Sequence, residues 1–330
     1  MTRAAAPARV VSLIASSTEM VCALGCGGRL VGRSHECDHP AWVQRFPAVT
    51  SPKFETEGAS YAIDQRVRAI VEQGLSVYSV DAAALAALEP DLIVTQVQCE
   101  VCAVSLRDLE EACCATLASR PRIVALEPNG LEELWRDIGA VAAALGVPDR
   151  GAALLASLKG RMKAIAEVAS RQPVRPRVVL IEWIEPLMAA GNWHPDLIAM
   201  AGGVDRFGAP GLHAPTLAWE ALRDTDPDVI VIAPCGFDLA RTARELQPLL
   251  ERPGWDTLRA VRDGRVALAD GNAFFNRPGP RVVETLEILA ELLHPAAFAF
   301  GHEGAGWIGL AAAGALGSRG PAGAGAQSGR

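Results

Sequence analysis

The sequence contains no apolar run that approaches the roughly 18 residues of a membrane-spanning helix, so no span is expected. It also has no excess of positive charge, because 31 Lys and Arg stand against 38 Asp and Glu, a formal net charge of −7. Since nucleic-acid binding depends on neutralising phosphates, this balance argues against such a partner. Phosphate-loop, dinucleotide, serine-hydrolase and zinc-protease motifs are all missing, which indicates a binding protein and not an enzyme.

A separate apolar segment of the secretory type is also missing at the N-terminus, because the one apolar run there, "VVSLI", is predicted to be the first strand. A cytoplasmic location is therefore expected, or a periplasmic one if the true start of the chain differs. Eight cysteines in 330 residues do not make a disulfide scaffold. In a reducing compartment most of them are expected to be free thiols.

Short β-rich runs alternate with Ala- and Leu-rich helical stretches, the pattern of α/β proteins with parallel sheets. The pattern restarts after residues 149–171, an amphipathic helical stretch of about 30 Å that is followed by prolines. We therefore predict two Rossmann-like lobes, residues 1–148 and 172–300, joined by one long helix. Gly, Ala and Ser dominate residues 301–330, which predicts a disordered tail.

Two loops concentrate potential metal ligands: "SHECDHP" and "TQVQCEVC" hold His35, Cys37, His39, Cys99 and Cys102. Both follow predicted strands of the first lobe, and ligands of open α/β sheets bind beyond the carboxyl ends of strands. Cysteine and histidine are ligands of zinc and other borderline-soft metals. The spacing permits a metal site, a redox CxxC pair, or side chains that only line a cleft.

Six segments follow one another in a specific order: "SLIASSTEMVCALG", "VGRSHECDHP", "LAALEPDLIVTQ", "LIAMAGGVDRF", "LAWEALRDTDPDVIVI" and "FFNRPGPRVVETLEIL". With them the chain resembles the cobalamin-binding proteins of bacterial ABC importers, in the iron-siderophore/cobalamin class of substrate-binding proteins. The resemblance covers residues 9–295, and the Cys- and His-rich loops place the chain in a subgroup without a signal peptide.

The resemblance implies that a corrinoid such as cobalamin binds in the cleft between the lobes and that an ABC permease is the partner. Phe274 and Phe275 match the aromatic pair that packs on the corrin. Glu19 and Glu220 match the two acidic residues, one per lobe, that dock onto arginines of the permease. Residues 55–80 are an insertion relative to the importer proteins.

Further ligand-binding candidates lie at the predicted strand ends: Trp183, Trp193 and His194 in the second lobe, and the Cys- and His-rich loops in the first. A thiolate or imidazole from His35, Cys37, Cys99 or Cys102 is a candidate ligand of the corrinoid cobalt. The importer proteins have no such ligand on the upper face of the corrinoid. Two alternatives stay open. In the first, the ligand is another metal chelate, either a haem or a ferric siderophore. In the second, the protein is a thiol-assisted corrinoid-processing enzyme.

Overall fold

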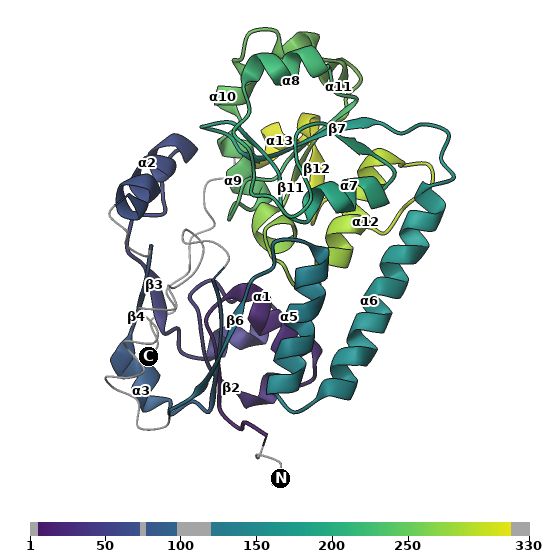
Figure 1. Cartoon of the computed structure of the whole chain (residues 1–330). Helices are drawn as coiled ribbons and strands as arrows, with labels where there is room; N and C mark the ends of the chain where they lie inside the picture. Colours follow the sequence, from purple (N-terminus) through teal and green to yellow (C-terminus); the bar gives the residue numbers. More distant parts are fainter. Residues whose placement is uncertain (1–5, 73–76, 98–119, 318–330) are drawn as a thin grey trace, which may run out of the picture.

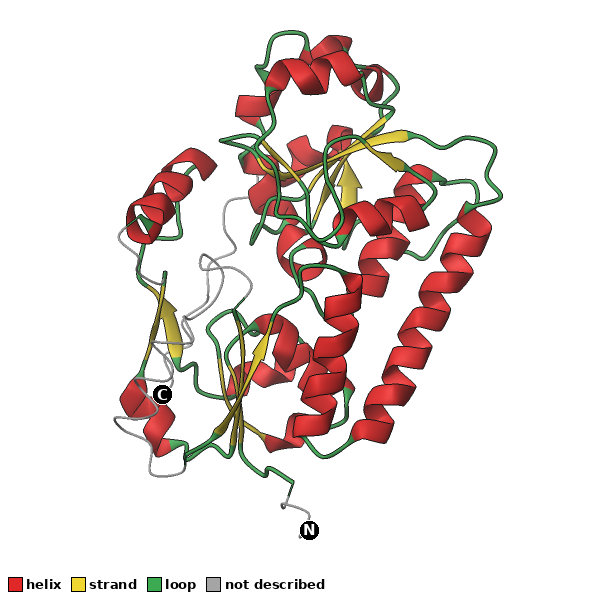
Figure 2. Ribbon diagram, in the orientation of Figure 1, coloured by secondary structure: helices red, strands yellow, loops and turns green. Residues whose placement is uncertain are grey.

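The chain folds around two separate β-sheets, and the computed structural model describes residues 6–72, 77–97 and 120–317 (Figures 1 and 2). The first sheet has the order β2-β1-β5-β6, and all its pairs are parallel. Its strands are β1 (Val10–Ser12), β2 (Leu30–Arg33), β5 (Leu92–Gln96) and β6 (Arg122–Leu126). A small antiparallel pair, β3 (Thr50–Pro52) with β4 (Tyr78–Val80), stands beside it.

The second sheet has the order β12-β11-β10-β7-β8, with β9 paired to β7. Its strands are β7 (Arg177–Trp183), β8 (Met188–Ala189), β9 (Val204–Asp205), β10 (Val229–Ile232), β11 (Val266–Ala269) and β12 (Trp307–Gly309). β7, β9, β10 and β11 pair in parallel, whereas β8 and β12 add antiparallel edges. β10 and β11 are buried along their whole length, as expected when helices cover both faces of a parallel sheet.

Helices connect the strands of both sheets. In chain order the described helices are α1 (Ala15–Ala23), α2 (Ser60–Val71), α3 (Ala82–Ala87), α5 (Leu131–Ala144), α6 (Pro148–Ala169), α7 (His194–Met200), α8 (Trp219–Thr225), α9 (Leu239–Arg244), α10 (Gln247–Leu250), α11 (Arg259–Arg262), α12 (Val282–Leu293) and α13 (Leu310–Gly317). Among the described residues, none of these helices combines the length and the apolar character needed to cross a bilayer.

The long helix α6 joins the two halves, as the sequence predicts. It begins with Pro148, whose missing N–H is not needed in the first turn. Its buried residues fall in one stripe at helical spacing: Gly151, Leu158, Met162, Ile165 and Ala169. Helix α6 packs against α5 of the first half and against α7 and α12 of the second (Figure 1). One continuous hydrophobic core therefore includes residues of both sheets.

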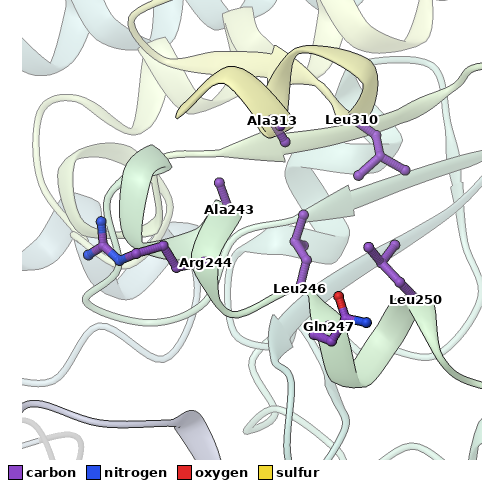
Figure 3. A pocket seen from close by; sticks show the side chains of 8 residues that line it. Ala243, Arg244, Leu246, Gln247, Leu250, Leu310 and Ala313 are labelled. Carbon is purple, nitrogen blue, oxygen red and sulfur yellow. The ribbon is translucent and has the colours of Figure 1, made fainter. Parts of the chain in front are cut away.

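The predicted disordered tail is wrong for residues 301–317. Trp307 to Gly309 form β12, which pairs with β11, and α13 packs against α9. The side chains of Leu246, Leu250, Leu310 and Ala313 meet around a hollow between these elements (Figure 3). The remaining residues of the predicted tail, 318–330, lie outside the described residues, and the predicted lobe boundaries stay predictions.

The segment that contains α2 bridges from the first half of the chain to the second. The backbone N–H of Ser60 donates to Glu245 Oε2 at 3.0 Å, and Arg241 Nη2 donates to the carbonyl oxygen of Thr56 at 2.6 Å. Arg241 belongs to α9, and Glu245 is the first residue after the end of that helix. α2 and α6 therefore provide two connections between the halves of the chain, through different helices of the second half (Figure 1).

Candidate functional site

A buried cluster of charged side chains joins the carboxyl-end loops of the two sheets. Arg277, which follows β11 and is 4% exposed, donates from Nη1 to Glu19 Oε1 at 3.1 Å and from Nη2 to Asp38 Oδ2 at 2.9 Å. Arg281 donates from Nε to Glu19 Oε2 at 2.9 Å and from Nη2 to Glu19 Oε1 at 2.6 Å. Two guanidinium groups thus face two carboxylates, so that the buried charges are paired.

The pairing with Arg277 determines the protonation state of Asp38. Burial alone would raise the pKa of the Asp38 carboxyl, but hydrogen bonds and charge from Arg277 outweigh it, and the pKa is lowered. Asp38 therefore stays ionised at neutral pH and binds Arg277 from the loop after β2.

A hollow of about 270 Å³ lies beside the cluster, lined among others by Cys22, His39 and Pro280. It is smaller than the roughly 300–1,000 Å³ of typical ligand pockets.

Cys37 is not the reactive thiolate that the sequence suggests. Its side chain is 1% exposed, and the Thr18 hydroxyl donates to its Sγ at 2.9 Å. Sγ also points to the carbonyl oxygen of Ser12, 3.9 Å away. Burial raises the pKa of the Cys37 thiol to about 11. Because metals bind the thiolate and not the thiol, this burial does not favour metal binding by Cys37, and its role as a metal ligand stays a prediction.

Among the described residues, the other members of the predicted metal site, His35 and His39, do not form a metal-binding group with Cys37. His35 is half-buried and turns toward Thr50 and Tyr78, whereas His39 is exposed. Cys99 and Cys102 lie outside the described residues. Within the part of the chain that the structure describes, three or more His, Cys, Asp or Glu side chains nowhere gather in a group that could hold a metal ion. The "HECDH" loop therefore does not form a zinc site by itself.

Trp183 is a half-exposed aromatic residue at the end of β7. Its Nε1 donates to the carbonyl oxygen of Glu185 at 2.9 Å, and its ring lies 5.3 Å from that of Phe237, measured between centroids. The guanidinium carbon of Arg241 is 4.1 Å from the centroid of the Phe237 ring. Two aromatic rings and one arginine are thus grouped at the carboxyl end of the second sheet, where ligands of such sheets bind.

Three other predicted ligand residues are core residues instead. Trp193, His194 and Phe275 are 4%, 1% and 1% exposed, respectively. The rings of His194 and Phe275 stack at 6.0 Å and 11°, and His194 Nε2 lies 2.8 Å from the carbonyl oxygen of Phe275. The residues after β8 therefore turn their side chains into the hydrophobic core. Their burial does not favour direct ligand contacts, which stay a prediction for these three residues.

Phe274 is half-buried, and its side chain has different neighbours from that of Phe275. The guanidinium carbon of Arg281 lies 5.2 Å from the centroid of the Phe274 ring, and the ring of His302 lies edge-on at 6.0 Å. The two phenylalanines belong to a π-helical turn, Gly271–Phe275. A pair that is adjacent in the sequence therefore separates, and only Phe274 keeps an accessible ring.

The two predicted docking carboxylates have different environments. Glu19 is 4% exposed and paired with Arg277 and Arg281, which does not favour docking onto a permease, and its docking role stays a prediction. Glu220 is exposed in the first turn of α8. A carboxylate at this position is also favoured by the positive end of the helix dipole.

His194 should make the protein less stable in acid. Burial lowers the pKa of His194 to about 4, against 6.5 for the unperturbed side chain, and the Glu182 carboxylate, 3.9 Å from Nδ1, does not offset that burial. Below pH 6.5 the unfolded chain binds a proton that the folded chain does not, so stability falls as the pH decreases from 6.5 toward 4. Between pH 6.5 and 5 the expected loss is about 2 kcal/mol.

Urea unfolding of the wild type and of His194→Gln at pH 7, 6 and 5 measures this contribution. The remaining ionisable groups are the same in both proteins, so the difference between the two pH profiles gives the contribution of His194 to stability. Parallel profiles would contradict the buried neutral histidine.

The family model described as "Periplasmic binding protein" matches residues 10–273. The chain belongs to this family. A curated relative, the ABC transporter substrate-binding lipoprotein YvrC of Bacillus subtilis (strain 168), described as uncharacterized, is 25% identical over 307 residues that cover 88% of this chain and 82% of the relative.

Two solved structures illustrate the likeness of the fold. A periplasmic heme-binding protein from Pseudomonas aeruginosa is 25% identical, with a TM-score of 0.66, over 88% of this chain and 94% of that protein. The periplasmic vitamin B12 binding protein BtuF of Vibrio cholerae is 19% identical, with a TM-score of 0.62, over 88% and 98%. The family to which the chain belongs is one of binding proteins, and the Bacillus relative is described as an ABC transporter substrate-binding lipoprotein.

These comparisons correct the expected cytoplasmic location. The family consists of periplasmic binding proteins, the Bacillus relative is a lipoprotein, and both solved structures are of periplasmic proteins. An extracytoplasmic location agrees with these findings. The prediction failed because it rested on the first residues alone, where an apolar run that belongs to β1 is the only hydrophobic segment.

Proposed function

We propose that this protein binds a metal tetrapyrrole, a corrinoid or a haem, between its two lobes for delivery to an ABC permease. The observation that carries the proposal is the group at the end of the second sheet, where half-exposed Trp183 packs on Phe237 beside Arg241. A flat macrocycle stacks on an aromatic ring, and an arginine can bind the polar side groups at its edge.

A corrinoid agrees with the sequence resemblance, and a haem agrees with the heme-binding neighbour from Pseudomonas aeruginosa. Both ligands are large planar chelates that bring their own metal. Such a cargo does not require a metal-binding cluster in the protein itself. The exposed Glu220 of α8 remains the proposed contact to the permease.

The ligand is identified by titrating the purified protein with hydroxocobalamin and, in parallel, with haemin, followed by absorption spectroscopy and calorimetry. Replacement of Trp183 with alanine should weaken binding of the true ligand about tenfold, because a lost aromatic contact costs about 1.4 kcal/mol. The matched control is Trp42→Ala, since Trp42 is 40% exposed and packs near Arg45 and Phe46. Saturable binding of neither chelate would contradict the proposed function.

A further inference from the structure

His35 lies on a loop that reaches the other lobe. It follows β2 by two residues and is half-buried. Three residues further along the same loop, Asp38 accepts hydrogen bonds from Arg277 of the second half. The short chain between these residues therefore holds His35 near the boundary of the two lobes, at the carboxyl end of the first sheet. This is the end at which ligands of such sheets bind.

The hydrogen bonds around His35 define its tautomer. The Thr50 hydroxyl donates its only proton to Ser34 Oγ at 3.1 Å. Thr50 Oγ1 can therefore only accept from the His35 ring, whose Nδ1 lies 2.8 Å away, and it also accepts from the His35 backbone N–H at 3.1 Å. Nδ1 thus carries the ring proton, and Nε2 keeps its lone pair. Within the described residues, Nε2 has no hydrogen-bond partner.

The ring is also held in place and kept neutral. The Tyr78 ring lies edge-on at 4.9 Å and 69°, and the Tyr78 hydroxyl donates to Glu36 Oε1 at 2.7 Å. Burial lowers the pKa of His35 below its usual value of 6.5, so the imidazole is neutral at pH 7. A neutral imidazole whose second nitrogen donates to an oxygen is the usual form of a metal-ligating histidine.

We propose that Nε2 of His35 binds the metal of the chelated ligand as an axial ligand. The inference rests on the proposed function, since it names the protein atom that reaches the metal of the tetrapyrrole. In the binding step the Nε2 lone pair forms a bond to cobalt(III) or iron(III), and the water or hydroxide at that axial position leaves. A leaving hydroxide takes up a proton from solvent, and the metal keeps its oxidation state.

Thr50 is a positioning residue in this arrangement, because it orients the ring through Nδ1 and does not touch the metal. Replacement of such a partner typically lowers metal affinity by about 10–100-fold. Thr50→Val removes the acceptor with little change in shape, and it should therefore weaken hydroxocobalamin or haemin binding at least about tenfold. His35→Ala should abolish the spectral change of the metal centre.

The experiment compares wild type, His35→Ala, Thr50→Val and the control His213→Ala, an exposed histidine of the second half of the chain. Each is titrated with hydroxocobalamin and with haemin while absorption spectrum and affinity are recorded, and circular dichroism establishes folding. We expect an imidazole-type spectral shift in the wild type and in His213→Ala. The shift should be lost in His35→Ala and regained on addition of free imidazole.

Cyanocobalamin provides a second measurement if the ligand is a corrinoid, because its tightly bound cyanide already occupies the upper axial position. Its affinity should be the same for wild type and His35→Ala. If a chelate binds with the same spectrum and affinity in both proteins, the axial role of His35 is overturned while the proposed function stands. If neither chelate binds the wild type, both are overturned.

Discussion

Replacing Arg277 with alanine should lower the free energy of unfolding by about 3 kcal/mol. Removing one partner of a buried ion pair costs about 3–5 kcal/mol, because the remaining charge is left without compensation in a poorly solvated place. Here Glu19 and Arg277 are 3% and 5% exposed as side chains. We expect the lower end of that range, because Arg281 continues to bind Glu19 after the substitution.

Urea unfolding at pH 7 measures this loss, and Arg161→Ala is the matched control. Arg161 of α6 also faces two carboxylates, Glu284 and Glu287 of α12, but its side chain is 44% exposed. Because the Arg161 side chain is largely in solvent and Glu287 keeps a second partner, His302, at 2.9 Å, this control should lose less stability than Arg277→Ala. If both substitutions lowered the free energy of unfolding equally, burial of the Arg277 cluster would not determine how much the cluster stabilises the fold.

The general architecture could be predicted from the sequence because it depends on local patterns. The stripe of α6 from Leu158 to Ile165 recurs at helical spacing, and the apolar runs that become β5 and β10 are short and end at polar loops. Such features depend on neighbours a few residues away. The restart of the pattern after α6 was therefore enough to predict two sheets.

The candidate site could be predicted only in part, because it depends on contacts between distant residues. Asp38 lies in the "HECDH" loop and Arg277 in "RPGPR", but no local pattern indicates that residues 239 positions apart form an ion pair. Of the ligand residues predicted at the strand ends, Trp183 and His35 remain accessible, whereas Trp193 and His194 turn into the core. Strand ends can be located from sequence, but side-chain directions in the loops that follow cannot.

The C-terminal segment shows how composition alone misleads. Gly and Ala dominate it, yet a few residues anchor it to α12. Glu291 accepts hydrogen bonds from the backbone N–H groups of Phe300 and Gly301, and its other oxygen accepts from Trp307 Nε1 at 2.8 Å. Averaging over a window of small residues hides anchors of this kind, and the order of residues 301–317 was therefore missed.

Replacing Phe275 with alanine should destabilise the protein by about 3–5 kcal/mol, the usual cost of removing a buried phenylalanine from a core. Phe275 is 1% exposed and stacks on His194, so its removal leaves a cavity that the surrounding helices cannot easily close. Phe274→Ala is the natural control, because Phe274 is chemically identical, adjacent and only half-buried. It should cost less than half as much.

The two substitutions also separate a core role from a ligand role. If Phe275 stacked on the ligand, as the family resemblance implies, its alanine variant would bind weakly while keeping wild-type stability. The structure predicts the opposite: a large loss of stability in urea unfolding, with binding per folded molecule nearly unchanged. Phe274 is only partly buried, beside Arg281 and His302, so its replacement should cost less than half as much stability as that of Phe275. A stable Phe275→Ala protein with impaired binding would therefore show that the turn Gly271–Phe275 rearranges when ligand binds.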